Sequence, residues 1–296
     1  MRPRRYTSAD EDSARWQDFA FRDGDIIVST RSKHGTTWMQ MILLLLIHQR
    51  PELPEPLSQL SPWLDHLVEP FDAVQQRLEN QSQRRVIKTH TPLDGIPSDD
   101  RATYIVVARH PLDGAVSLYH QGDNIDRDRL AQLTGAPPSN NPSSRPDLHD
   151  WLTDWIDRQA TAVVALDSLP GVMWHLTDAW VRRDQDNVAL VHFDDLQNDL
   201  EGQMRRLADL LGLPIFAARW AQLVVAAGFD AMRAHADQLA PNTGGVLKDP
   251  RAFFHQGRSG AGASVLDAAE LKRYHHRVRT YAPGNLLDWL HRGRHR

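Results

Sequence analysis

A lysine, a glycine and two threonines stand between a β-branched run and a long apolar run, the arrangement of an anion-binding loop. Residues 26–28 are isoleucine, isoleucine and valine, the types that favour a buried strand. Lys33, Gly35, Thr36 and Thr37 follow, and either threonine can cap the helix that the next apolar residues predict. The first turn of a helix offers unpaired backbone N–H groups and the positive end of the helix dipole. Together with a lysine, these groups predict a site for a phosphate or a sulfate.

The loop differs from the usual nucleotide-triphosphate loop, G-x-x-x-x-G-K-[ST], in which the lysine follows the second glycine. Here Lys33 precedes Gly35 by two residues, and Ser29 takes the place of the first glycine. Neither this loop nor the other motif-like segments place a carboxylate as a magnesium ligand. The sequence therefore favours another kind of phosphate or sulfate chemistry, with a magnesium-dependent kinase as one alternative and a loop that merely caps a core helix as another.

Further side chains that could take part in a reaction or bind a phosphate lie at the ends of other predicted strands. His90 and Arg109 each follow such a strand directly, and Lys88 lies two residues before His90 on the same side of its strand. A histidine with a pKa near ~6.5 suits the removal of a hydroxyl proton at neutral pH. An arginine can fork to phosphate oxygens. Because ligands of parallel sheets bind at the carboxyl ends of the strands, we expect Lys33, His90 and Arg109 to face one crevice.

The elements that must position these residues alternate between strand and helix. Apolar runs without strict alternation are typical of parallel strands buried on both faces. Gly212 and Pro214 end the last helical pattern. The predicted strands cover 26–29, 85–89, 104–108 and 188–191, and the predicted helices cover 36–49, 111–120 and 195–211. We therefore predict an α/β fold with a central parallel sheet flanked by helices, in one domain over 1–296.

Long polar segments interrupt this pattern. Residues 122–147 have few apolar side chains, and residues 235–262 are rich in glycine. Both segments are predicted to be exposed, mobile loops. Loops of this kind commonly form lids and substrate walls on α/β enzymes.

Composition excludes several classes of function. The 296 residues are 41% hydrophobic and 24% charged, with a net charge of −4, so no basic surface suggests a nucleic-acid partner. Without cysteine, there is no disulfide framework, thiolate nucleophile or zinc–thiolate site. Residues 1–13 are charged and lack an apolar signal core, and the longest apolar run, 41–47, is too short to insert stably in a membrane. We expect a cytoplasmic protein.

Four sequence blocks in fixed order carry a family resemblance. They are S-K-H-G-T-T-W (32–38), V-I-K-T-H-T-P-L (86–93), Y-I-V-V-A-R-H-P-L-D-G-A-V-S-L-Y-H (104–120) and F-F-H-Q-G-R-S-G (253–260). Together they resemble the soluble sulfotransferases that depend on 3′-phosphoadenosine 5′-phosphosulfate, and the chain looks like a bacterial member. The resemblance implies a P-loop-like strand-loop-helix for the 5′-phosphosulfate, transfer of a sulfuryl group to a hydroxyl of a small molecule, and no metal.

The resemblance assigns the first block to the 5′ end of the donor. Lys33 would contact the oxygen that bridges phosphate and sulfate, and Trp38 would lie beside the adenine. The 5′-phosphate would receive backbone N–H and hydroxyl groups from His34, Gly35, Thr36 and Thr37. In the family position 34 is usually a small residue, so His34 either contacts the donor or points to solvent.

The second and third blocks supply the base and the ligands of the 3′-phosphate. By resemblance, His90 is the general base on the acceptor hydroxyl, and Lys88 supports charge on the transferred group. Arg109 and Ser117 match the family's 3′-phosphate ligands. Asp113, in the same block, is predicted to be a solvated helix residue.

The fourth block departs from the family pattern R-K-G-x-x-G. His255 and Gln256 replace two cations before Gly257, and Arg258 can restore one charge. Phe193 stands where many members have a tyrosine. These departures raise the alternative of a donor-binding protein without catalysis. The acceptor is predicted only as a hydroxyl-bearing small molecule, and no C-terminal dimerisation motif is recognisable, so no oligomeric state is predicted.

Overall fold

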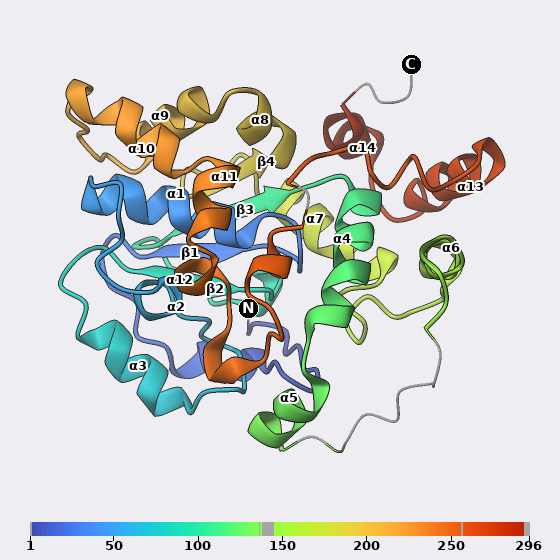
Figure 1. Cartoon of the computed structure of the whole chain (residues 1–296), viewed down its shortest axis with the longest axis horizontal. Helices are drawn as coiled ribbons and strands as arrows, with labels where there is room; N and C mark the ends of the chain where they lie inside the picture. Colours follow the sequence, from blue (N-terminus) through green and yellow to red (C-terminus); the bar gives the residue numbers. More distant parts are fainter. Residues whose placement is uncertain (1, 136, 138–144, 256, 293–296) are drawn as a thin grey trace.

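The computed structural model describes residues 2–135, 137, 145–255 and 257–292. At its centre is a parallel sheet of four strands in the order β2-β1-β3-β4 (Figure 1). The strands are β1 (Ile26–Ser29), β2 (Val86–Thr89), β3 (Thr103–Ala108) and β4 (Val188–His192). The predicted α/β fold with a central parallel sheet is confirmed, and each predicted strand agrees with the observed one to within a residue at either end.

The register of the sheet brings the predicted site residues to one edge. Ser29, the last residue of β1, is paired with Thr89 at the end of β2, and Ala108 of β3 is paired with His192 of β4. Since all the strands run in the same direction, the segments that follow them leave the sheet on the same side. Lys33, His90 and Arg109 lie on these segments.

The helices cover both faces of the sheet. They are α1 (Thr36–His48), α2 (Leu57–Leu60), α3 (Phe71–Glu79), α4 (Pro111–Asn124), α5 (Arg127–Thr134), α6 (Leu148–Asp157), α7 (Leu169–Val181), α8 (Phe193–Asn198), α9 (Leu200–Leu210), α10 (Trp220–Ala226), α11 (Phe229–Ala234), α12 (Ala236–Leu239), α13 (Ala268–Val278) and α14 (Gly284–His291). Short 3₁₀ turns lie at Ser13–Asp18, Leu93–Gly95, Ala217–Arg219, Thr243–Gly245 and Arg251–Phe253.

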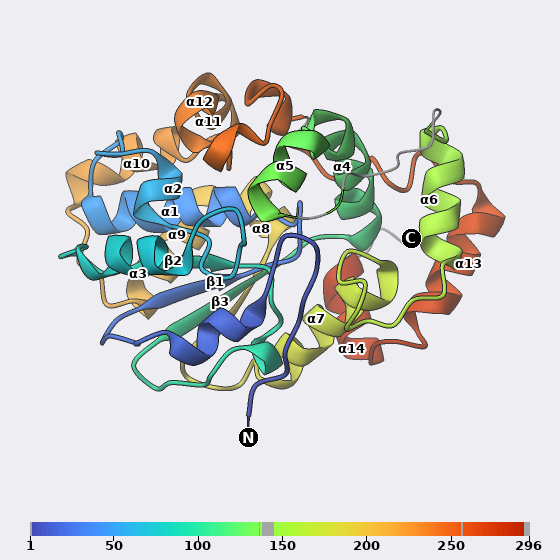
Figure 2. The same ribbon diagram turned by 90° about the horizontal axis from the view of Figure 1, so that it is seen from below.

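Three apolar clusters hold these layers together. On one face of the sheet α1, α9 and α10 pack against the strands, and every residue of α1 from Met39 to Leu46 is buried, all of them apolar except Gln40. On the other face the strands meet the Ser13–Asp18 turn, α3 and α7. A third cluster joins α4, α6, α7, α13 and α14, which gather at one side of the molecule in both ribbon views (Figure 2).

One predicted helix is divided in two. The sequence predicts a single helix over 195–211, whereas the structure has α8 and α9 separated at Asp199. The backbone of Asp199 leaves the helical region at φ −148°, and its carboxylate accepts a hydrogen bond from Gly202 N at 2.9 Å. An aspartate in this position caps a new helix rather than continuing the old one.

The two segments predicted as loops contain helices. Within 122–147, α4 continues to Asn124 and Asp126 caps α5 by accepting from Arg129 N at 2.9 Å, while residues 136 and 138–144 lie outside the described part. Within 235–262, α12 and two 3₁₀ turns form. The prediction of unbroken loops is therefore wrong for these parts.

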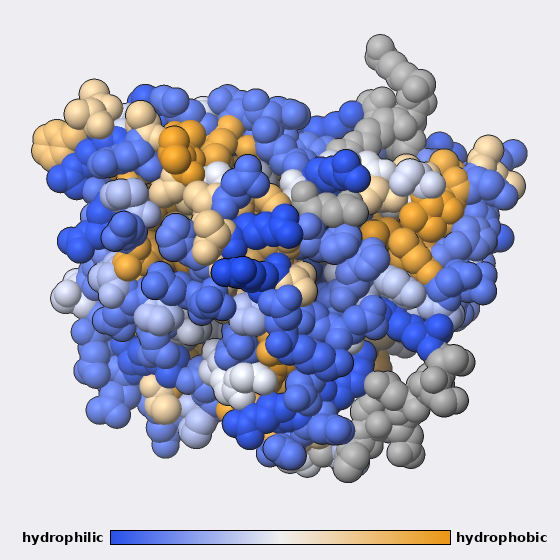
Figure 3. All heavy atoms as spheres, viewed as in Figure 1, coloured by the Kyte–Doolittle hydropathy of each residue, from blue (hydrophilic) through white to orange (hydrophobic). Residues whose placement is uncertain are grey.

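The surface in Figure 3 is mostly hydrophilic, with apolar patches over α10 and α11 and between α4 and α13. Among the helices that the structure describes, none has the length and apolar character needed to cross a membrane.

A buried ion pair lies at the amino-terminal edge of the sheet, opposite the edge that carries Lys33, His90 and Arg109. Arg85 donates to Asp25 through Nε at 2.7 Å and through Nη2 at 2.5 Å. The side chains are only 3% and 1% exposed, and the guanidinium lies 4.9 Å from the ring centre of Phe19. Asp25 directly precedes β1 and Arg85 directly precedes β2, so the pair joins two neighbouring strands at their starts.

We predict that Arg85→Ala lowers the free energy of unfolding by about 3–5 kcal/mol, because it leaves the Asp25 carboxylate buried without its partner. Urea denaturation measures the loss. The control is Arg158→Ala, which removes an exposed pair with Asp154 one helical turn away and should cost no more than about 0.5 kcal/mol. Equal effects of the two substitutions would contradict the prediction.

Candidate active site

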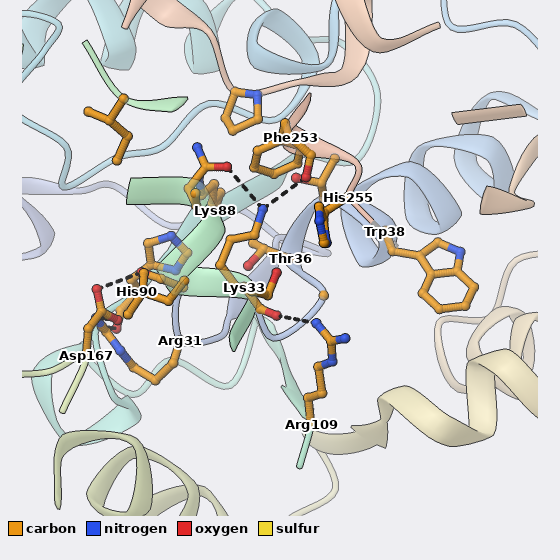
Figure 4. A pocket seen from close by; sticks show the side chains of 18 of the residues that line it. Arg31, Lys33, Thr36, Trp38, Lys88, His90, Arg109, Asp167, Phe253 and His255 are labelled. Atoms are coloured by element: carbon orange, nitrogen blue, oxygen red, sulfur yellow. Dashed lines mark hydrogen bonds and ion pairs between the residues drawn. The ribbon is translucent and has the colours of Figure 1, made fainter. Parts of the chain in front are cut away.

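A cavity of about 450 Å³ opens at the carboxyl edge of the sheet. Nearly all of the residues that the sequence singled out line it: Lys33, Gly35, Thr36, Thr37, Trp38, Lys88, His90, Arg109, Ser117, Phe193, His255, Gly257 and Arg258. Gln256 lies outside the described residues. In Figure 4 Lys33 stands between Lys88 and His90 on one side and Arg109 and Trp38 on the other.

The loop from β1 to α1 gains its shape from left-handed backbone. Lys33 has φ 65° and Gly35 has φ 108°, and a lysine in this region is held there at a cost of about 1 kcal/mol or more. A Cβ on residue 35 would also lie 3.0 Å from the Phe193 ring. Glycine is therefore required at position 35, and the strained lysine marks a position fixed by its surroundings.

Helix α1 begins without a side-chain cap. Gly35 is its N-cap residue, and among the described residues no side chain caps the first backbone N–H groups. The prediction that Thr36 or Thr37 caps the helix is wrong, because both threonines already lie in its first turn and Thr36 Oγ1 pairs with Thr30 Oγ1 instead. The free N–H groups thus remain available to an anion in the cavity.

Lys33 is held at the centre of the cavity by neutral partners. Its Nζ donates to the carbonyl of Phe253 at 3.2 Å and to Gln121 Oε1 at 3.4 Å, and it lies 3.6 Å from the ring centre of Phe253. Burial, together with the charges of Arg109 and Lys88, lowers the pKa of Lys33 to about 7. A lysine so placed gains charge when an anion arrives beside it.

His90 is oriented by the main chain. Its Nδ1 pairs with the carbonyl of Thr30, and since a carbonyl only accepts, Nδ1 carries the proton and Nε2 carries the lone pair. Burial, with the charges of Lys88 and Arg31, holds the pKa of His90 well below its ordinary range. The imidazole is therefore neutral at pH 7 and able to accept a proton at Nε2.

Lys88 lies beside His90 on an aromatic support. Its Nζ is 3.7 Å from the ring centre of Trp63, which stacks on His66 at 4.0 Å and meets His90 edge-on at 4.5 Å. Burial lowers the pKa of Lys88 to about 8, and the carboxylates of Glu11 and Asp65 limit the fall.

Arg109 links three of the sequence blocks. It donates to the carbonyl of Lys33 at 3.1 Å and to the carbonyl of Arg258 at 2.9 Å, and it lies 4.4 Å from the ring centre of Phe193. Phe193 in turn meets Trp38 edge-on at 5.2 Å. The phenylalanine at position 193 thus keeps the aromatic surface for which the family usually has a tyrosine.

Asp113 is buried, not solvated as predicted. It is 2% exposed, and its carboxylate accepts hydrogen bonds from Gly260 N at 2.9 Å and Gly262 N at 2.8 Å. Burial alone would raise the pKa of this carboxyl, but the two N–H donors outweigh it and hold the pKa below its ordinary value. Asp113 thereby fastens the fourth block to α4.

His34 points neither into the cavity nor to solvent. It is 2% exposed, its Nδ1 pairs with the carbonyl of Ser32 at 2.9 Å, and its ring packs on Gly114, where a Cβ would lie 2.6 Å from the imidazole. Burial lowers the pKa of His34 to about 4, so the ring is neutral. Its role in this structure is to pack the loop against α4.

His255 lies at the exposed rim of the cavity. Its ring stacks on His120 with centres 4.2 Å apart. Partial burial, helped by the neighbouring His120 and Lys33, lowers the pKa of His255 from its ordinary value. It therefore carries little charge at neutral pH.

Sequence reasoning missed a polar network next to His90. Arg31, 2% exposed, donates to the carbonyl of His90 and, at 2.7 Å, to Asp167. Ser32 Oγ donates to the other oxygen of Asp167 at 3.1 Å. Arg31 lies in the loop that the sequence predicts to bind an anion, but no sequence pattern connects it to Asp167, which is 136 residues away.

Comparison with known proteins identifies the family. The sequence model of the Sulfotransferase domain matches residues 23–280. A glycolipid sulfotransferase of Mycobacterium bovis is 40% identical over 98% of this chain and 94% of its own length. One of Mycobacterium tuberculosis is 39% identical with the same coverage.

Solved structures share the fold. Retinol dehydratase in complex with androsterone and the inactive cofactor PAP has a TM-score of 0.69 at 19% identity, over 91% of this chain and 83% of its own. A mouse sulfotransferase complexed with PAP has a TM-score of 0.65 at 17% identity, over 95% and 88%. The chain therefore belongs to the sulfotransferase family and is an enzyme that transfers a sulfuryl group from 3′-phosphoadenosine 5′-phosphosulfate to a hydroxyl of a small-molecule acceptor.

Proposed function

We propose that His90 is the general base of this transfer. The observation that carries the proposal is a neutral imidazole whose Nδ1 is bonded to the Thr30 carbonyl and whose Nε2 is left to accept a proton, beside two lysines on the cavity wall. An acceptor hydroxyl at Nε2 would lose its proton as it attacks the sulfur. Lys33 stabilises the charge on the departing phosphate, and Lys88 the charge on the transferred group.

The donor is held by groups on the side of Lys33 opposite His90 and Lys88. The uncapped first turn of α1, with Thr36 and Thr37, suits the 5′-phosphate. Arg109 and Ser117, with Arg258 near them, bind the 3′-phosphate. The adenine lies against the aromatic pair of Trp38 and Phe193. These assignments are supported by the way in which the loop, α4 and the fourth block meet at Arg109.

The acceptor is a glycolipid or a related amphipathic molecule with a hydroxyl group. Two relatives of nearly full length are named glycolipid sulfotransferases. The cavity fits an apolar chain, since a large part of its lining is aliphatic or aromatic. Such side chains include Ile125, Leu130, Phe229, Met232, Val246 and Leu247.

His90→Ala is expected to lower kcat by about 10²–10⁴-fold, because it removes the proton acceptor. The Kd for 3′-phosphoadenosine 5′-phosphate (PAP), the spent donor, should stay within a few-fold. Turnover assays and calorimetry measure the two quantities. His149→Ala, at an exposed histidine outside the cavity, is the control and should be fully active. Unchanged turnover in His90→Ala would remove His90 from the mechanism.

PAP should bind with uptake of a proton near neutral pH. Lys33 has a pKa of about 7 in the unbound protein, and a phosphate beside it favours the charged form, so its pKa rises on binding. Affinity is then greatest below that pKa and falls, by up to about tenfold per pH unit, as the pH rises toward 9. The phosphate's own protonation near pH ~6 sets the lower limit of the useful range.

Calorimetry of PAP at several pH values, in buffers of different ionisation enthalpy, tests this uptake. Lys33→Arg keeps the charge across the range and should flatten most of the pH dependence. A binding enthalpy that does not depend on the buffer would show that no proton is taken up.

Asp113→Asn should weaken PAP binding by about tenfold, although Asp113 need not touch the ligand. An amide has one acceptor oxygen and a donor group, so Gly260 N or Gly262 N loses its partner, at a cost of about 1–3 kcal/mol. The segment that carries Arg258 then loosens. Asp128→Asn, on the exposed face of α5, is the control. A PAP affinity equal to wild type would mean that the tether does not position the donor site.

A further inference from the structure

The amino-terminal segment brings an unpaired carboxylate to the cavity wall. Glu11 lines the cavity and is 9% exposed. Within the described part of the chain, no N–H or O–H group donates a hydrogen bond to its carboxylate. Its oxygens are not among the buried atoms of the described residues that lack a hydrogen-bond partner, so they reach the cavity, where a bound ligand can donate to them.

The position of this carboxylate is fixed by the backbone around it. Glu11 N donates to Ser8 Oγ at 3.1 Å, and Glu11 O accepts from Ser8 N at 2.9 Å. Glu11 also forms an antiparallel bridge with His66. His66 in turn stacks on Trp63, whose ring contacts Lys88 and meets His90 edge-on. The side chain of Glu11 is thus built into the wall beside the proposed base and is not a loose surface group.

Charges of both signs surround Glu11, because Asp65, Asp10 and Asp167 act on it as well as the cations. Arg31 and Lys88 both lie close enough to act on its charge. Arg31, however, donates to the His90 carbonyl and to Asp167, and Lys88 rests on the Trp63 ring. Neither cation donates a hydrogen bond to the Glu11 carboxyl among these contacts, so the carboxyl can pair with a ligand in the cavity. An aliphatic hydroxyl can both donate to it and accept from it.

Burial raises the pKa of the Glu11 carboxyl to about 8, although Arg31 opposes the shift. A protonated carboxyl has one O–H to donate and a carbonyl oxygen to accept, so it too pairs with a hydroxyl. Both forms can therefore pair with a hydroxyl of the ligand. Thr7, Ser8, Asp10 and Asp167 add short polar side chains to the cavity lining.

We propose that Glu11 binds a second hydroxyl of the acceptor, next to the one that His90 deprotonates, so that the site selects a polyhydroxylated head group such as a sugar ring. The inference rests on the proposed role of His90, to which Glu11 is linked through its bridge to His66 and the stack of His66 on Trp63, whose ring meets His90. A phenol or a sterol with a single hydroxyl leaves the Glu11 carboxyl unpaired, and sites with unpaired polar groups reject such analogues.

The test compares two acceptors with the same alkyl chain, octyl β-glucoside and 4-octylphenol. For wild type, Glu11→Ala and Glu11→Gln, kcat/KM is measured with each acceptor. Glu11→Ala should lower the value for the glucoside by about tenfold or more, mainly through KM, and leave the value for the phenol unchanged. Glu11→Gln keeps the shape and one acceptor oxygen and should lose less. Glu55→Ala, exposed and outside the cavity lining, is the control.

Two results would overturn the proposal: sulfation of the phenol but not the glucoside by the wild type, or an equal glucoside-to-phenol ratio in wild type and Glu11→Ala. Absence of turnover with both acceptors in the wild type would count against the proposed function instead. In that case binding of octyl glucoside to the PAP-loaded protein decides: weaker binding in Glu11→Ala supports the role of Glu11, and equal binding refutes it.

Discussion

The cavity depends on holding several cations close together in surroundings that water only partly reaches. Three of these cations, all in the cavity lining, each rest on an aromatic ring: Lys33 on Phe253, Lys88 on Trp63 and Arg109 on Phe193, at 3.6, 3.7 and 4.4 Å from the ring centres. A desolvated cation on an aromatic face gains about 2 kcal/mol. Carboxylates in direct contact would also neutralise these charges, but they would compete with an incoming phosphate.

Backbone carbonyls also accept hydrogen bonds from these cations. Lys33 donates to the Phe253 carbonyl, and Arg109 donates to the carbonyls of Lys33 and Arg258. Because a carbonyl is available at every position, these contacts do not depend on which side chains the fourth block carries. The geometry around Arg109 is therefore compatible with His255 in a place where the family has a cation.

The parts of the structure set by local sequence were predictable. β-branched runs set the strands, and the strand-loop-helix with Lys33 follows from a short stretch of chain. What could not be predicted depends on partners that are distant in the sequence. Asp113 is a buried tether because Gly260 and Gly262 fold back onto α4, and Arg31 acquires its role from Asp167. The hydrophobic periodicity of the sequence carries no information about such long-range contacts.

The contact between His34 and Gly114 has a consequence for how the family varies. The imidazole fills the space that a side chain at position 114 would occupy, so the loop and α4 share a fixed volume at this point. A chain with a small residue at 34 has room for a larger one at 114, whereas a histidine at 34 requires glycine there. Substitutions at the two positions should accordingly be coupled across evolution, each compensating the volume of the other, without altering a residue that lines the cavity.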